Sequence, residues 1–531
     1  MGAVAGSTVT SGLLGVASNV LTAAYFGRGP ATDAFFMAQS LLRIFGKFFQ
    51  TGPLRQIVMP IFSEACDDDR AQAQRYASNI ITTTGIVLGL VTLGLWVVSP
   101  WIVAVIAPGF QGAQLALTIR LTRLFVPIIF CTILLNLLTS FLHTFQRFGF
   151  AEWMARLPSA VMILALLWGA GRWPIDSLVW ALIIGSLIQV VVVAIGVARL
   201  GLSYSPVLDW RQPELRTTWR RLSPFFLSSA AVQAQLIVHR IVTSTQPTGT
   251  LSALSYADRI VQFLDALISV VPLVLFPQLI QDALKENRVH LRQRLERVAL
   301  VTSLVTFPAL VALLVFSQPA VELVFQHGRF DGLATQETAL ALGWLLIGLF
   351  AWTVWGLCKT TAYAVQRPGL VNATVIVVCG IASLLTLVLG PRLGLTGLAI
   401  SSSAVPFLMS AGYLWLLRRD VPAIHRIVWN GPFGRVVLAA LGMGGFCWVL
   451  RETIWSGWFA HAGALIRLIG LGVLSLSGAA GYWMWLVVFR VEARHELPLL
   501  IRRAVAGSHR QTDAPVVVGV KEIILSSSST S

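Results

Sequence analysis

Long apolar runs, separated by short polar or Pro/Gly-containing breaks, cover most of the chain up to residue 489. A helix needs about 20 predominantly apolar residues to cross a bilayer, so this pattern predicts fourteen membrane spans. The first, second, seventh and eighth are the least hydrophobic, because they also carry polar and charged residues. The predicted spans are 7–26, 33–62, 78–106, 116–145, 151–171, 176–198, 222–245, 252–281, 295–317, 336–365, 369–390, 393–417, 433–453 and 463–489.

The composition agrees with a chain that is solvated mainly by lipid. Of the 531 residues, 56% are hydrophobic and only 12% are charged, whereas an ordinary soluble chain has about 25% charged residues. So few charges cannot supply the polar surface of three or four soluble domains. The sequence therefore predicts an all-α polytopic membrane protein with about 14 transmembrane helices.

Basic residues concentrate in the loops that follow even-numbered spans. Five arginines lie between residues 199 and 221, one lysine and four arginines between 285 and 297, and four arginines between 418 and 435. The loops at 107–115 and 246–251 contain no Lys or Arg. By the positive-inside rule, the even-numbered loops and both termini are predicted to be cytoplasmic. This distribution also accounts for the net charge of +16 without a nucleic-acid partner, which would require a basic patch on a water-facing surface.

An internal repeat relates the two halves of the chain at a distance of six spans. Span four exits through residues 145–149 (Phe-Gln-Arg-Phe-Gly) and span ten through residues 365–369 (Val-Gln-Arg-Pro-Gly). An offset of six preserves orientation, so the sequence predicts two parallel six-helix repeats with two extra C-terminal helices. Chance similarity between apolar helices is the alternative, and the shared Gln-Arg exits argue against it. The predicted parts are an N-terminal lobe (1–200), a cytoplasmic linker (201–221), a C-terminal lobe (222–420), two additional helices (421–490) and a basic, then Ser/Thr-rich, cytoplasmic tail (491–531).

Several ionisable residues fall inside predicted spans, where a charge costs at least about 2.5 kcal/mol unless it faces protein or water. Basic groups predominate among them, which indicates a cationic cavity between the lobes and an anionic ligand such as a phosphate or diphosphate. The candidate substrate-binding residues are Arg259, Lys47, Arg240 and Arg43.

Other charged residues in the spans have structural alternatives. Asp33 could cap the start of span two, and Asp258 could cap span eight or pair with the adjacent arginine. Arg120 and Arg123 lie near the outer end of span four, where long side chains extend to the head groups. Arg55 is near the cytoplasmic end of span two, and both interpretations stay open for it.

No pattern typical of catalysis or of a cofactor occurs in the chain. The motifs HExxH, GxSxG and GxxxxGK[ST] are absent, and the eight histidines are dispersed. The five cysteines are scattered without a CxxC pair, which indicates buried apolar residues rather than a metal site. The sequence therefore predicts a protein that is not an enzyme, with no cofactor and no bound metal.

Five short blocks resemble the MurJ/MviN family of lipid II flippases, in order and at that family's spacing, between about residues 7 and 420. The blocks TDAFF (32–36) and YADR (256–259) are the most specific of them. The other three are MPIFSE (59–64), APGF (107–110) and FQHGRF (325–330).

This resemblance implies a bacterial cytoplasmic-membrane protein of the multidrug/oligosaccharidyl-lipid/polysaccharide exporter superfamily. Such a protein would have two six-helix lobes around a cationic cavity, and would move undecaprenyl-diphosphate-linked peptidoglycan precursor to the outer leaflet by alternating access. The last two spans would form a groove for the polyprenyl tail. By position, Asp33 and Arg259 match family residues, and Lys47 falls where the family has an arginine. The lipid bilayer and the lipid-linked saccharide are the implied partners, with the cell-wall synthesis machinery as a further candidate.

The chain departs from the family pattern in its first two spans and in span eight. The first-span pattern SR-x-x-G-x-x-RD has lost both arginines, and Asn19 stands at the aspartate position. Gln262 replaces a frequent glutamate, and the EGAFSQAF stretch is altered at residues 50–57. Asn19, Gln262, Asp33 and Asp258 are therefore candidates for supporting roles beside the cations.

Three alternatives to lipid II transport remain open at this stage. The chain could export another polyprenyl-diphosphate-linked polysaccharide unit, or it could be a degenerate, non-transporting scaffold for cell-wall assembly. A membrane-embedded glycosyltransferase would need a catalytic carboxylate or histidine in a long outer loop, and the predicted outer loops are short.

Overall fold

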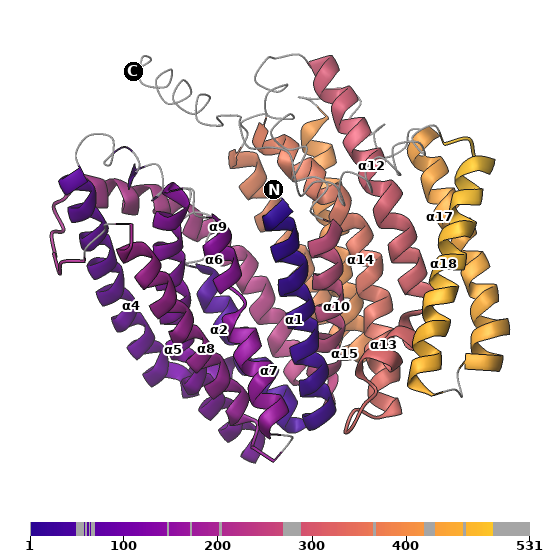
Figure 1. Ribbon diagram of the computed structural model, residues 1–531, viewed down its shortest axis with the longest axis horizontal. Coiled ribbons are helices and arrows are strands. Elements are labelled where there is room, and N and C mark those ends of the chain that lie inside the picture. The colour runs from indigo at the N-terminus through magenta and orange to yellow at the C-terminus, as the bar shows by residue number, and fades with distance from the viewer. Residues whose placement is uncertain are drawn as a thin grey trace.

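The computed structural model describes residues 2–48, 58, 61, 62, 64, 70–145, 148–169, 172–200, 204–268, 288–364, 368–418, 431–459 and 463–491, and every regular element in these ranges is a helix. The long helices run side by side as two groups that meet in the middle of the molecule (Figure 1). Arg55, the repeat exits at 146–147 and 365–367, and the tail beyond residue 491 lie outside the described residues.

The N-terminal lobe is built around α5, which packs against α2, α4 and α8, while α1 lies at the boundary with the other lobe (Figure 1). Its helices are α1 (Gly2–Phe26), α2 (Pro30–Phe48), α4 (Arg70–Ile106), α5 (Gly112–Thr144), α6 (Phe148–Met154), α7 (Leu157–Gly169) and α8 (Asp176–Ala198). The fifth predicted span is divided between α6 and α7, because the chain turns at residues 155 and 156.

The C-terminal lobe has its densest packing between α14 and α15, with α9 and α10 on the side that faces the first lobe. Its helices are α9 (Pro213–Ser244), α10 (Thr250–Ile268), α12 (Arg288–Val315), α13 (Ser317–Phe325), α14 (Gly332–Ala364) and α15 (Pro368–Leu417). The sequence did not predict the short helix α13. Predicted spans eleven and twelve lie within α15, which is broken at Gly394, where φ is +58° and ψ is −132°.

The two additional helices pack beside α12 at the edge of the C-terminal lobe (Figure 1). They are α17 (Gly431–Leu450), which continues into the π-helical segment η1 (Arg451–Phe459), and α18 (Ala464–Val488). Arg467 of α18 forms an ion pair with Glu322 of α13. This pair attaches the outer helix to the lobe.

Eight of the described helices are long and apolar enough to cross a membrane, namely α4, α5, α8, α12, α14, α15, α17 and α18. The helices α1, α2, α9 and α10 are not among them. These four correspond to the spans that were predicted to be least hydrophobic, and they are the helices at which the lobes meet. Polar residues can be kept in these helices because they face the other lobe rather than lipid.

The segment between the lobes is folded onto the N-terminal lobe. The sequence predicted a linker up to residue 221, whereas α9 already begins at Pro213. The Asn79 amide of α4 donates to the backbone oxygen of Asp209 at 2.8 Å and to Oε1 of Gln212 at 2.6 Å. Tyr76 and Thr218 share a buried hydrogen bond of 2.9 Å. These contacts tie the start of α9 to α4.

Candidate functional site

The predicted cations lie on α2, α9 and α10, which pack against one another at the lobe boundary. Arg43 and Lys47 lie on α2, Arg240 on α9 and Arg259 on α10. The charge of Arg43 acts on each of the other three, so Arg43 lies within electrostatic range of Lys47, Arg240 and Arg259. We call these four residues the cation cluster. The sequence supplied only their spacing along the chain, and the fold brings them together.

Asp258 is the acidic group that acts on the cluster. Its charge reaches Lys47, Arg240 and Arg259. Its carboxylate accepts a hydrogen bond of 2.5 Å from the Gln262 amide rather than capping a helix, since α10 begins eight residues earlier at Thr250. Among the described residues, Asp258 is the one carboxylate whose charge acts on these three cations, so positive charge is in excess there.

Arg259 is held by neutral partners. Its guanidinium donates to Oε1 of Gln262 and to Oε1 of Gln39, each at 3.4 Å. No carboxylate of a described residue forms an ion pair with it. Two long bonds to amide oxygens use part of the five-donor guanidinium, and the remaining donors can bind an oxyanion. Gln39 was not predicted as a site residue, because a single neutral amide in a helix carries no sequence signal.

Exposure changes steadily along the two helices that face one another. On α2, Asp33 is buried, Gln39 and Arg43 are half-buried and Lys47 is exposed. On α10, Ser252 and Tyr256 are buried, Arg259 is half-buried and Gln262 is exposed. The contact between these helices is thus most completely buried near Asp33 and Tyr256, and the cation cluster lies toward their more exposed ends.

The end at which the lobes are packed together, which we call the closed end, lies opposite the N-terminus of α1 (Figure 1). It contains the loops 27–29, 107–111, 245–249 and 326–331. The backbone amide of Arg329 donates to the Ala24 oxygen at 2.9 Å, and the Tyr256 hydroxyl donates to the Gly27 oxygen at 3.1 Å. Backbone groups of the two lobes are thus in direct contact.

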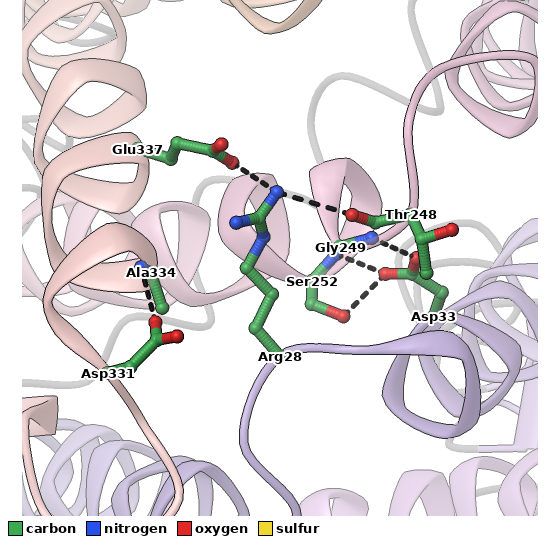
Figure 2. Close-up of polar contacts among 8 residues, drawn as sticks. All are labelled: Arg28, Asp33, Thr248, Gly249, Ser252, Asp331, Ala334 and Glu337. Atoms are coloured by element: carbon green, nitrogen blue, oxygen red, sulfur yellow. Dashed lines mark hydrogen bonds and ion pairs between the residues drawn. The ribbon is translucent and has the colours of Figure 1, made fainter.

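Asp33 belongs to the closed end and not to the cation cluster. Its carboxylate accepts hydrogen bonds from the backbone amides of Gly249 (2.6 Å) and Ser252 (2.8 Å) and from the Ser252 hydroxyl (2.5 Å), as Figure 2 shows. The sequence suggested that Asp33 could cap its own helix. Instead, it caps α10 of the opposite lobe.

Arg28 makes a second polar connection across the closed end. Its guanidinium forms an ion pair of 2.6 Å with Glu337 of α14 and donates to the Thr248 oxygen at 3.2 Å (Figure 2). Asp331, in contrast, caps its own lobe's α14 by accepting from the Ala334 amide at 2.8 Å. The two aspartates at this end therefore perform the same local function, one across the lobes and one within a lobe.

Replacing Asp33 with alanine is expected to weaken the closed end without unfolding either lobe. Loss of a helix cap costs about 0.5–2 kcal/mol, which shifts the equilibrium between closed and open states by roughly 2- to 30-fold. Labelling of a cysteine introduced at the fully buried Ala253 with a membrane-impermeant maleimide measures this shift. The matched control is Asp331→Ala, which removes a cap within one lobe. Equal labelling of the two variants would contradict the inter-lobe role.

The remaining candidates do not join the cation cluster. Asn19 is buried, and its amide donates to the Gly15 oxygen of its own helix at 2.7 Å. Arg120 pairs with Asp176 at 2.8 Å, and Arg123 lies over the Trp96 ring at 4.8 Å. Both arginines lie in the first half of α5. No cluster of three or more potential metal ligands occurs among the described residues.

Comparison with known proteins gives one consistent family. Residues 22–469 match the family model described as lipid II flippase MurJ. A probable lipid II flippase MurJ of Rhizobium tropici is 26% identical over 91% of this chain and 92% of its own length. The lipid II flippase MurJ of Burkholderia cenocepacia is 25% identical over 92% and 96%.

Solved structures match the fold at lower sequence identity. A lipid II flippase MurJ in an inward closed conformation has a TM-score of 0.76 at 19% identity, over 91% of this chain and 98% of that one. An inward-facing multidrug transporter of the MATE family has a TM-score of 0.60 at 14% identity, over 78% and 96%. The chain thus shares its fold of two helical lobes with these structures.

Proposed function

The chain belongs to the MurJ family of lipid II flippases, and from this premise we propose that it moves lipid II across the membrane with the cation cluster as the diphosphate-binding site. It is a multi-pass membrane transporter and not an enzyme. The observation that supports the proposal is the position of Arg43, whose charge acts on Lys47 of its own helix and on Arg240 and Arg259 of the other helices at the lobe boundary.

The diphosphate of a lipid-linked precursor suits this arrangement for electrostatic reasons. Its oxygens accept charge-assisted hydrogen bonds, and the planar guanidinium binds two of them at once. Arg259 offers donors that amide oxygens occupy only weakly, at 3.4 Å. Asp258 lowers the net charge of the cluster without neutralising it, so the site can attract the diphosphate and still release it.

The two ends of the lobe boundary differ in how completely they are buried, and this difference supports transport by alternating access. We assign the closed end to the outer side, because the loops after spans three and seven carry no Lys or Arg, and the termini to the cytoplasm. In this state the cluster would be open to the cytoplasmic leaflet, where the precursor is made. Transport would then require the contacts of Asp33 and Arg28 to separate, together with the 3.3 Å hydrogen bond from the Gly109 amide to the Ser244 hydroxyl, while the cytoplasmic ends come together.

The first helix is the feature that favours a second candidate cargo. Residues 2–26 of α1 contain no charged side chain, and Asn19 bonds to its own helix. Within the part of the chain that the structure describes, the cluster therefore depends on α2, α9 and α10, and another polyprenyl-diphosphate-linked saccharide would meet the same cations. A direct contact with the cell-wall synthesis machinery remains a further proposal.

Complementation distinguishes these cargoes. Cells depleted of their own lipid II flippase are expected to grow when they produce this chain, and not when they produce the Arg259→Ala variant. Failure of a well-expressed, membrane-inserted wild-type chain would exclude lipid II. Rescue of a strain that lacks a polysaccharide-unit exporter would then favour the second cargo.

A further inference from the structure

A second candidate binding site lies away from the lobe boundary. An open pocket of about 370 Å³ lies where α12, α13 and α14 meet the start of η1. Its lining includes Leu314, Ser317, Gln318, Gln336, Trp344 and Arg451. All of these residues belong to the C-terminal lobe or the additional helices, and none of them belongs to the cation cluster or the closed end.

Arg451 supplies the positive charge of this pocket. Its guanidinium donates to the Val315 oxygen at 3.3 Å and to Oε1 of Gln318 at 3.4 Å. Among the described residues no carboxylate pairs with it. Arg467, the other arginine that connects the additional helices to α13, is neutralised by Glu322. The two hydrogen bonds of Arg451 are long and go to neutral acceptors, so its positive charge and its other N–H donors can still bind an anion.

Arg451 is also the first residue of η1, where α17 changes to a π-helical segment of nine residues. Such segments are rare in proteins overall, and those that occur are often part of a functional site. Beside the arginine, the rim of the pocket carries the Ser317 hydroxyl and the amides of Gln318 and Gln336. These groups can hydrogen-bond a phosphate that the guanidinium holds.

The opposite wall of the pocket is apolar and reaches the surface. Leu340 is 47% exposed, Ile347 39% and Leu314 38%, and all three line the pocket. Trp344, whose ring has an apolar body and one polar group, also lines the pocket. In a membrane-spanning helix, exposed aliphatic side chains contact acyl chains. The pocket thus combines one unneutralised cation with a surface for a hydrocarbon chain.

We propose that this pocket binds a phospholipid of the surrounding bilayer, with its phosphate on Arg451 and an acyl chain along α14. The surrounding bilayer is the source because the pocket is lined only by residues of one lobe and the additional helices. A lipid bound here would fill the junction between α13, α14 and α17. It would hold the additional helices against the lobe, in parallel with the pair Arg467–Glu322.

Native mass spectrometry of the full purified chain, titrated with phosphatidylglycerol in detergent, tests the site. Arg451→Gln is expected to weaken retention of one lipid by about tenfold, which corresponds to about 1.4 kcal/mol. The control is Arg435→Gln, at the other end of the same helical segment, where the guanidinium donates to the Arg490 oxygen at 3.4 Å and lines no part of this pocket. This control is expected to retain lipid like the wild type.

A second variant fills the pocket and leaves the arginine in place. A Cβ atom at Gly343 would meet only Leu314 Cδ1, at 3.7 Å, so leucine at this position enters the pocket without a backbone clash. Gly343→Leu is expected to weaken retention by a similar factor. Wild-type retention by both variants would overturn the proposal. A parallel titration uses undecaprenyl phosphate. If the two variants retain this lipid less well but retain phosphatidylglycerol like the wild type, a bilayer phospholipid is not the occupant.

Discussion

Replacing Arg259 with alanine is expected to lower lipid II transport by roughly 100-fold or more while the protein is still inserted. A hydrogen bond to a charged group contributes about 1.5–3 kcal/mol, and 2.7 kcal/mol corresponds to about 100-fold. The variant removes donors for the diphosphate and also one of four positive charges in the cation cluster. Its amide partners, Gln39 and Gln262, cannot replace the charge.

Two variants make this prediction specific. Arg259→Lys keeps the charge but loses the two-pronged guanidinium, so it should retain an intermediate rate. Arg123→Ala removes a half-buried arginine that lies over the Trp96 ring and not in the cluster, and it should transport normally. The measurement is the rate at which lipid II reaches the outer surface, normalised to the amount of protein in the membrane. A wild-type rate for Arg259→Ala would remove this residue from the binding site.

Replacing Gly109 with alanine is expected to prevent the closed end from forming. A Cβ atom at this position would lie 2.1 Å from the Ser244 backbone oxygen and 2.8 Å from Thr245 Cα. The obstructing atoms are backbone and cannot rotate away. Overpacking usually costs about 1–3 kcal/mol, and its upper end corresponds to a shift of roughly 100-fold toward the open state. The rate of lipid II transport should also fall, because alternating access requires the state in which the closed end is formed.

The control for this variant is Gly29→Ala in a neighbouring loop. No atom lies within 4 Å of a Cβ built at Gly29, and its φ is not positive. The readout is again maleimide labelling of a cysteine introduced at the buried Ala253. Strong labelling is expected for Gly109→Ala and background labelling for Gly29→Ala. Background labelling of both variants would show that the close approach of Gly109 to α9 does not control closure.

The sequence predicted the membrane architecture well because the relevant signal is local. The length and hydrophobicity of each apolar run are enough to predict a transmembrane helix. The low hydropathy of α1, α2, α9 and α10 also indicated the helices that face the other lobe. The short helix α13 and the start of α9 at Pro213 were not predicted. Neither depends on hydrophobicity, since α13 is too short to span a bilayer and the start of α9 is held by contacts with α4.

The candidate site was predicted less completely, because its contacts join distant parts of the chain. Asp33 and Gly249 are 216 residues apart, and no spacing rule connects them. The blocks that resemble the family contain Asp33, Gly109, Tyr256 and Arg329, and their contacts lie at the closed end. Of the residues in those blocks, Asp258 and Arg259 lie instead within electrostatic range of the cations that the sequence suggested, and their role in binding stays a prediction.

The appearance of lipid II on the outer surface of cells that lack their own flippase tests the central claim most directly. Production of this chain is expected to restore outer-surface lipid II, and the Arg259→Ala variant, at equal abundance in the membrane, is expected to leave it in the inner leaflet. Lipid II that stays in the inner leaflet despite abundant, correctly inserted wild-type chain would contradict the assignment of the cation cluster to this cargo.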